Sequence, residues 1–356
     1  MEQLQQGFTF THSRHFADWL SEIGSSLAFT TYQAGKLCIV GLNAAGIITA
    51  FERTFERSMG IGFLPRQRSF FLATKYQLVR FDEFRPKGKN YEGWDVLFAP
   101  HQTWITGDID IHDVAALDDS TPIFVNTSFS CLATVSPGFS FKPTWWPPFI
   151  SRLAPEDRCH LNGMALEGGT PRYATLVAAS DVTDGWRERR AEGGVVWDIA
   201  AGKPLAQGLS MPHSPVLHEG RLWLLNSGTG EFGFIRPGEG KFNAVAFCPG
   251  YARGLAIIGR YAVIGLSLFR ENTSFQGLVL ERTLTARGAE PRCGVIVVDL
   301  DSGNTIEWLR MDGVVVKEIF DVAVLPGVRN AALIGFLTNE VERLIMIDES
   351  QQPKRI

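Results

Sequence analysis

The sequence predicts an all-β protein that folds as a single β-propeller. A phrase of the form G-φ-A or D-V-A, with φ apolar, introduces a group of short strands roughly every 40 to 50 residues. Turn-forming stretches such as LDSGN and HEGR separate the strands, and helical spacing is nearly absent. A β-sandwich would not repeat one first-strand phrase at this period, and an open solenoid is the remaining alternative.

The number of repeats favours seven blades. Units with the first-strand phrase cover residues 58–82, 112–136, 162–209, 213–237, 253–311 and 320–350. Residues 27–42 add a unit without a first strand, whose LAFTTYQ resembles the FLATKYQ of the next unit. Six blades would result instead if residues 27–56 and 320–350 merged into one irregular blade.

One short helix is expected ahead of the strands. Apolar residues recur at helical spacing from Phe16 to Ile23, and Ser13 is a candidate N-cap. We expect this helix to pack on the propeller disc. The predicted domain organisation is an N-terminal helical extension at 1–26, one propeller at 27–350 and a C-terminal tail at 351–356.

Composition argues against several classes of partner. The net charge of −4 provides no basic face for nucleic acid or an anionic membrane. The chain shows neither a secretory signal pattern nor a long apolar run, so a cytoplasmic location is expected. The five cysteines are far apart, form no CxxC pair and are expected to be buried apolar residues. GTGEFG, at 228–233, lies between two strands and not before a helix, so no nucleotide cofactor is expected.

Polar residues gather where the predicted first strands begin. In a propeller the first strand of each blade lines the central channel, so residues at the strand entrances converge on one spot. Three successive units each place a histidine there, namely His112, His160 and His213. The same entrances also hold Asp110, Asp113, Asn162, Arg253 and Asp321.

These residue types admit three interpretations. The three histidines could bind zinc, iron or another divalent metal; they could act with Asp113 as catalytic residues without a metal; or they could bond neighbouring loops. Candidate substrate-binding residues are Arg253, as an anion holder, Asn162 and Asp321. Trp145, in the aromatic and proline-rich stretch 136–151, could form a wall of the pocket, although packing between blades explains it equally well.

Several long phrases resemble a known family. GDIDIHDVA, FVNTSFSCLATVSP and PPFISRLAPEDRCHLNGMA are similar to an uncharacterised bacterial family of conserved hypothetical proteins, defined as a domain of unknown function, over residues 27–345. That resemblance implies a propeller-like architecture and no established reaction. CHLNGMAL is also similar to the asparagine-glycine phrase of gluconolactonase and regucalcin-type propellers. This second resemblance implies a divalent metal such as calcium as cofactor, with Asn162 as its ligand.

Two functions follow as hypotheses. The first is a small-molecule-binding propeller, an enzyme that hydrolyses or eliminates a carbonyl, ester or lactone-type substrate at the channel mouth, with or without a metal. The second is a non-catalytic scaffold that binds a protein or peptide. The insertion at 269–292 could be a lid or a subunit contact, and the sequence does not indicate the oligomeric state.

Overall fold

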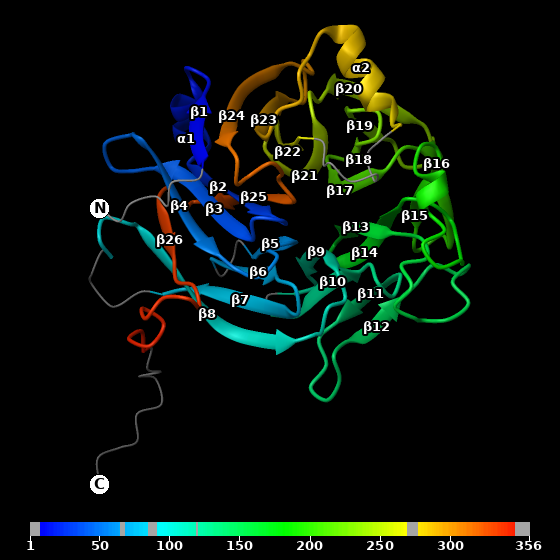
Figure 1. Ribbon diagram of the computed structural model, residues 1–356, viewed down its shortest axis with the longest axis horizontal. Coiled ribbons are helices and arrows are strands. Elements are labelled where there is room, and N and C mark those ends of the chain that lie inside the picture. Colours follow the sequence, from blue (N-terminus) through cyan, green and yellow to red (C-terminus); the bar gives the residue numbers. More distant parts are fainter. Residues whose placement is uncertain (1–7, 65–67, 85–90, 119, 269–276, 346–356) are drawn as a thin grey trace.

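Six β-sheets are arranged radially around a central axis (Figure 1). The computed structural model describes residues 8–64, 68–84, 91–118, 120–268 and 277–345. The innermost strands of neighbouring sheets contact each other all the way round, so the ring is closed. The predicted all-β propeller is therefore confirmed, whereas the favoured count of seven blades is wrong, because there are six.

Blades 1 to 3 each consist of consecutive antiparallel strands that run from the axis to the rim. Blade 1 contains β5 (Ile61–Leu64), β6 (Ser69–Ala73), β7 (Gln77–Glu83) and β8 (Val96–Ile105). Blade 2 contains β9 (Ile111–Ala116), β10 (Pro122–Asn126), β11 (Cys131–Thr134) and β12 (Lys142–Trp145). Blade 3 contains β13 (Leu161–Glu167), β14 (Thr170–Leu176), β15 (Gly194–Asp198) and β16 (Lys203–Leu209).

Blades 4 to 6 follow the same pattern, with one exception at the closure of the ring. Blade 4 contains β17 (Pro212–His218), β18 (Arg221–Asn226), β19 (Glu231–Ile235) and β20 (Phe242–Phe247). Blade 5 contains β21 (Tyr251–Ile258), β22 (Tyr261–Ser267), β23 (Gly294–Asp299) and β24 (Thr305–Gly313). Blade 6 contains β25 (Asp321–Pro326), β2 (Ser25–Thr31), β3 (Lys36–Leu42) and β4 (Ile48–Thr54).

Blade 6 explains why the blade count was wrong. Its innermost strand β25 comes from the C-terminal part of the chain and pairs antiparallel with β2, so that Leu27 lies opposite Val324. The unit at residues 27–42, which lacks a first strand in the sequence, thus receives one from the far end of the chain. The strands of residues 27–56 and the first strand of the C-terminal unit form one blade, which gives the six-blade alternative.

Two further strands join the termini to blades at the rim. β1 (Phe8–His12) pairs antiparallel with β24 at the edge of blade 5, and β26 (Ala331–Leu333) pairs parallel with β8 at the edge of blade 1. Part of the expected N-terminal extension therefore belongs to the propeller itself. The predicted tail at 351–356 lies outside the described residues.

The expected N-terminal helix is present as α1 (Phe16–Ile23), packed against blades 5 and 6. Ser13 is not its N-cap, because His15 occupies that position without a side-chain cap. The hydroxyl of Ser13 instead accepts the N–H of Trp308 at 3.0 Å, which ties the start of the helix to β24. Gly24 ends the helix in the left-handed conformation, with φ of 58°.

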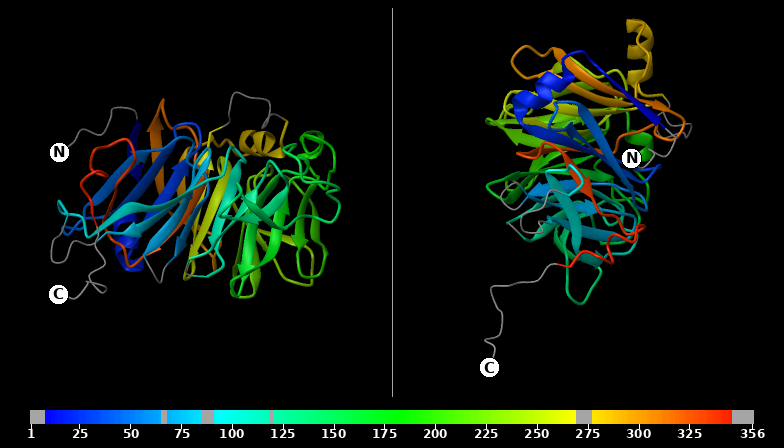
Figure 2. Two further views of the ribbon diagram at one scale, coloured as in Figure 1. Left: turned by 90° about the horizontal axis from the view of Figure 1, so that it is seen from below. Right: turned by 90° about the vertical axis from the view of Figure 1, so that its left-hand side faces the viewer.

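A second helix, α2 (Val279–Arg287), lies in the described part of the 269–292 insertion and on one face of the disc (Figure 2). Leu280 and Leu284 pack into a buried cluster with Trp186 and Tyr251, next to the 3-10 helix η1 (Arg187–Arg189). This part of the insertion therefore covers its own propeller. Within the described chain, neither α-helix is long and apolar enough to cross a membrane.

Candidate functional site

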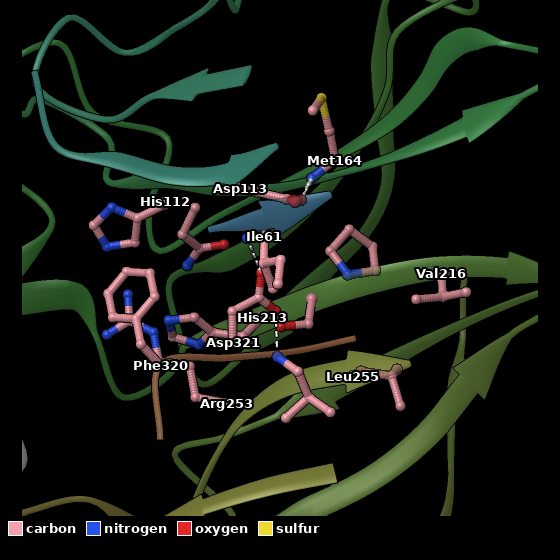
Figure 3. Close-up of a pocket in the computed structure, with 14 residues that line it drawn as sticks. Ile61, His112, Asp113, Met164, His213, Val216, Arg253, Leu255, Phe320 and Asp321 are labelled. Carbon is pink, nitrogen blue, oxygen red and sulfur yellow. Dashed lines mark hydrogen bonds between the residues drawn. The ribbon is translucent and has the colours of Figure 1, made fainter. Parts of the chain in front are cut away.

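A cavity of about 140 Å³ lies at the centre of the propeller (Figure 3). The first strands of all six blades contribute to its walls. Six residues that the sequence places at strand entrances line it, namely His112, Asp113, Asn162, His213, Arg253 and Asp321. The structure thus brings together side chains that are far apart in the sequence.

Neighbouring blades are joined around the axis by a repeated hydrogen bond. In blades 6, 2 and 4, a side-chain oxygen on the first strand accepts an N–H from the first strand of the next blade. The three bonds are Asp321 Oδ2 with Ile61 N at 2.9 Å, Asp113 Oδ2 with Met164 N at 2.8 Å and Ser214 Oγ with Gly254 N at 3.1 Å. The propeller centre therefore repeats in units of two blades, three times around the axis.

Glycines in blades 1, 3 and 5 permit close approach at the other three junctions, where blade 1 meets blade 2, blade 3 meets blade 4 and blade 5 meets blade 6. A Cβ on Gly163 would lie 2.5 Å from Pro215 Cδ, and one on Gly254 would lie 2.8 Å from Asp321 Cα. Gly60 occupies the corresponding place in blade 1, against Asp113. The G-φ-A phrase of the sequence therefore marks the points where one first strand packs against the next.

The hydrogen bonds of His112 determine which of its ring nitrogens carries the proton. Its Nδ1 lies 3.1 Å from Asp110 O and 2.9 Å from Thr127 Oγ1. The Thr127 hydroxyl donates its own proton to Leu161 O at 2.6 Å, so it can only accept from the ring. Nδ1 must therefore be the donor, and Nε2 keeps a lone pair.

His213 repeats this arrangement two blades further on. Its Nδ1 contacts Met211 O at 2.8 Å and Ser227 Oγ at 3.2 Å, while the Ser227 hydroxyl donates to Ala252 O at 2.7 Å. Burial lowers the pKa of both His112 and His213 well below the usual 6.5, and the charge of Arg253 lowers it further. The cavity is therefore bordered by two neutral imidazoles, each with Nε2 as a hydrogen-bond acceptor.

The two carboxyl groups of the cavity have raised pKa values. Burial raises the pKa of Asp113 to about 6, and burial together with the nearby charge of Asp113 raises that of Asp321 to about 8. Near neutral pH, the two carboxyl groups therefore hold one proton between them. Such a pair provides an acid and a base in one cavity.

Arg253 and Asn162 add hydrogen-bond donors to these groups. The guanidinium of Arg253 lies 3.8 Å above the ring centre of Phe320, which holds it at the axis. Asn162 Oδ1 accepts a hydrogen bond from Thr175 Oγ1 at 2.7 Å, whereas its buried Nδ2 has no hydrogen-bond partner among the described residues. This amide N–H is therefore available as a donor to an acceptor group in the cavity.

His160 does not line the cavity, contrary to the prediction. Its Nδ1 lies 2.8 Å from Asp157 Oδ2, and its ring stacks on Trp186 with 4.2 Å between ring centres. The ring edge contacts His112, at 5.0 Å between centres. His160 precedes β13, and it is Asn162 that occupies the strand position equivalent to His112 and His213.

Trp145 is also placed away from the cavity. It ends β12, the outermost strand of blade 2, where it pairs with Leu132 and packs against the cluster between blades 2 and 3. Packing between blades, the other explanation of the aromatic stretch, therefore accounts for this residue.

The predicted metal site receives no support from the donor geometry. No group of three His, Cys, Asp or Glu side chains within the described ranges is arranged to hold a metal ion. The Nδ1 atoms of His112, His160 and His213 are engaged in hydrogen bonds, so these rings could bind a metal only through Nε2. Binding of zinc, iron or calcium therefore stays a prediction from the sequence.

Sequence reasoning missed the hydroxyl groups that orient the two histidines. Thr127 and Ser227 each follow an asparagine at the end of the second strand of their blade, in FVNTS and LLNSG. This repeated Asn-Thr or Asn-Ser pair is a signal that could have identified them. Ser214 and Phe320, which also line the cavity, occupy places equivalent to Asp113 and His112 but differ from them in residue type.

Comparisons with known proteins support the fold and leave the reaction open. A family model described as "Domain of unknown function (DUF4915)" matches residues 14–334. None of the curated proteins matches the chain.

Solved structures with similar folds share little sequence with this chain. A chain of a nidogen/laminin complex is 11% identical with a TM-score of 0.53, and covers 85% of this chain and 99% of its own. A protein of unknown function from Bacteroides caccae is 11% identical with a TM-score of 0.50, covering 85% and 98%. A gluconolactonase from Xanthomonas campestris is 10% identical with a TM-score of 0.47, covering 81% and 86%. At such identities the likeness concerns the fold alone.

Proposed function

This chain belongs to the family described as domain of unknown function DUF4915, and we propose that its central cavity binds a small carbonyl compound and catalyses acid–base chemistry on it. The substrate class is an ester or lactone that is hydrolysed, or a related carbonyl compound that undergoes elimination. The observation that carries the proposal is the pair Asp113 and Asp321, whose pKa values are separated around neutral pH beside Arg253.

A purely structural role does not explain why these residues are carboxylic acids. The bond between blades needs only an oxygen that accepts an N–H, and Ser214 supplies one in blade 4. Burying a carboxyl group costs more free energy than burying a hydroxyl, because the charged form loses its hydration. Two acids at equivalent positions therefore support a chemical role in addition to the structural one.

The proposed hydrolysis divides the proton transfers between the two acids. Asp113 takes a proton from water, the resulting hydroxide adds to the carbonyl carbon, and the bond to the leaving oxygen breaks as Asp321 donates its proton to that oxygen. Arg253 stabilises the negative charge that develops on the carbonyl oxygen. The Nε2 atoms of His112 and His213 accept hydrogen bonds from substrate hydroxyl groups, and Asn162 donates to a substrate oxygen.

The volume of the cavity limits the substrate. A cavity of about 140 Å³ holds roughly five water-sized groups. The substrate is therefore a small molecule or the reactive end of a longer one, and a bulky ring system is excluded from the centre.

A panel of small esters and lactones, followed by acid release at constant pH, tests the proposal. We expect turnover of at least one compound, with a bell-shaped pH dependence between about pH 6 and about pH 8. Asp113→Asn and Arg253→Gln should each lower kcat/KM by about a hundredfold or more. Asp301→Asn is the control, because Asp301 is exposed at 75% and lies on a rim turn.

The proposal would be wrong if no compound of the panel were turned over or bound. It would equally be wrong if Asp113→Asn retained full turnover while melting like the wild type. Either result would favour the scaffold hypothesis, in which Asp113 and Asp321 only form hydrogen bonds between blades.

A further inference from the structure

A second cavity, of about 300 Å³, lies near the rim, away from the central one. Strands of blade 5 form its floor, and the end of β20 and the segment after α2 form its sides. It shares no lining residue with the central cavity. A ligand here would therefore be recognised independently of the proposed reaction.

The deep part of this cavity is apolar. Leu266, Val295 and Leu309 are each about 1% exposed, and Trp308 and Ala289 continue the apolar surface toward the mouth. Water gains few hydrogen bonds in such surroundings, so displacing it with an apolar group is favourable. The cavity thus fits the hydrocarbon or aryl part of a ligand.

The mouth of the cavity is cationic. Arg287, Arg292 and Arg310 line it, and the described lining residues include no Asp or Glu. Arg310 pairs with Asp312 at 2.7 Å, and the guanidinium of Arg287 lies 4.4 Å from the ring centre of Phe247. The carboxylates of Asp312 and Glu318 both act electrostatically on Cys293 in the cavity wall. Three guanidinium groups beside two carboxylates still leave an excess of positive charge next to an apolar pocket.

We propose that this cavity binds a soluble amphipathic monocarboxylate, with its short acyl or aryl body inside and its carboxylate at the three arginines. Guanidinium groups match a carboxylate geometrically, because two parallel N–H groups can face its two oxygens. A volume of about 300 Å³ suits a ligand of roughly ten non-hydrogen atoms. A diacyl lipid is too large for it.

Calorimetric titration of the full-length protein with octanoate tests this site, with octan-1-ol as the uncharged analogue. We expect saturable binding of one octanoate and at least about tenfold weaker binding of octan-1-ol. The double variant Arg287→Gln/Arg292→Gln should weaken octanoate binding by about tenfold or more. Thr305→Trp should block the cavity, because Thr305 is an exposed lining residue.

Arg236→Gln is the matched control, since Arg236 is an exposed rim arginine that pairs with Glu239 and does not line the cavity. It should bind octanoate like the wild type, and thermal melting should show all variants folded. Absence of saturable octanoate binding would overturn the proposal. So would equal binding of octan-1-ol, or undiminished octanoate binding by the folded arginine and Thr305→Trp variants. Loss of ester turnover in the Asp113→Asn protein with octanoate binding retained is expected, because the two sites are separate.

Discussion

At the scale of single residues, the bond between neighbouring first strands uses a carboxyl group at two places around the axis and a hydroxyl group at the third. The position that accepts an N–H from the next blade is Asp113, Asp321 or Ser214. Burial shifts the pKa of both carboxyls upward, and that of Asp321 by more than that of Asp113. The upward pKa shift follows from the loss of water around the buried group. Because the unfolded chain does not have this shift, the stability of the protein depends on pH.

Asp321→Asn should change how stability depends on pH. The folded protein holds the Asp321 proton up to about pH 8, whereas the unfolded chain releases it near the ordinary pKa of 3.8. The stabilisation from this group is complete below about pH 4 and is lost as pH rises through about 8, by at most about 1.4 kcal/mol per pH unit. Asparagine does not titrate, so the variant should gain stability relative to wild type between pH 5 and pH 8.

Urea unfolding of the wild type and of Asp321→Asn at several pH values measures the difference in their free energies of unfolding. The titration of His112 and His213 affects both proteins and cancels in this difference. Asp301→Asn, on the exposed rim, should show a difference from wild type that does not vary with pH. A constant difference for Asp321→Asn as well would contradict the raised pKa.

At the scale of strands, the packing of one first strand on the next depends on a missing side chain. β13 approaches β17 so closely that a Cβ on Gly163 would lie 2.5 Å from Pro215 Cδ and 2.8 Å from Thr175 Oγ1. Thr175 also bonds Asn162, so this contact positions part of the central cavity. Close packing of strands and the geometry of the site are therefore coupled.

Gly163→Ala should destabilise the protein by about 1–3 kcal/mol, because the added methyl overpacks a contact that cannot yield freely. Gly138→Ala is the control, since a Cβ there would meet nothing within 4 Å, and its effect should stay within about 0.5 kcal/mol. Denaturant unfolding measures the free energy of unfolding of both variants. Equal stabilities of the two variants would show that β13 and β17 separate at little cost.

At the scale of the whole molecule, the ring is closed in blade 6, where β25 from the C-terminal part of the chain pairs with β2 from the N-terminal part. β25 supplies the inner edge of blade 6 and also Asp321, so closure and the central cavity depend on the same strand. β1 and β26 add a second connection at the rim, beside β24 and β8. We expect the inner closure to have the larger effect, because β25 also contacts the first strands of the two neighbouring blades, β21 and β5.

Two truncations should compare the C-terminal connections, β25 and β26, with the N-terminal connection, β1. Removal of residues 321–356 takes away β25 and exposes the edge of β2, so we expect loss of a cooperative melting transition, with aggregation. Removal of residues 1–12 takes away only β1 among the described elements and should leave a folded ring with a lower Tm. Circular dichroism measures the melting of both truncated proteins, and size-exclusion chromatography measures their aggregation. If the C-terminal truncation melted like the full-length protein, the role of β25 would be contradicted.

The sequence by itself determined the propeller architecture and the location of the candidate site at the entrances of the first strands. Its repeated first-strand phrase indicates a propeller because glycine and small residues are required where first strands pack together, as at Gly163. The same period places His112, Asp113, Asn162, His213, Arg253 and Asp321 at strand entrances, and all six line one cavity.

Only the tertiary structure decided the blade number, the members of the site and their protonation. The pairing of β25 with β2 joins opposite ends of the chain, and no local pattern records such a partner. His160 has a φ of 48° just before β13, so it turns away to Trp186 while Asn162 takes the place at the axis. The raised pKa of Asp321 and the lone pairs on Nε2 of His112 and His213 result from burial and from hydrogen bonds that exist only in the closed ring.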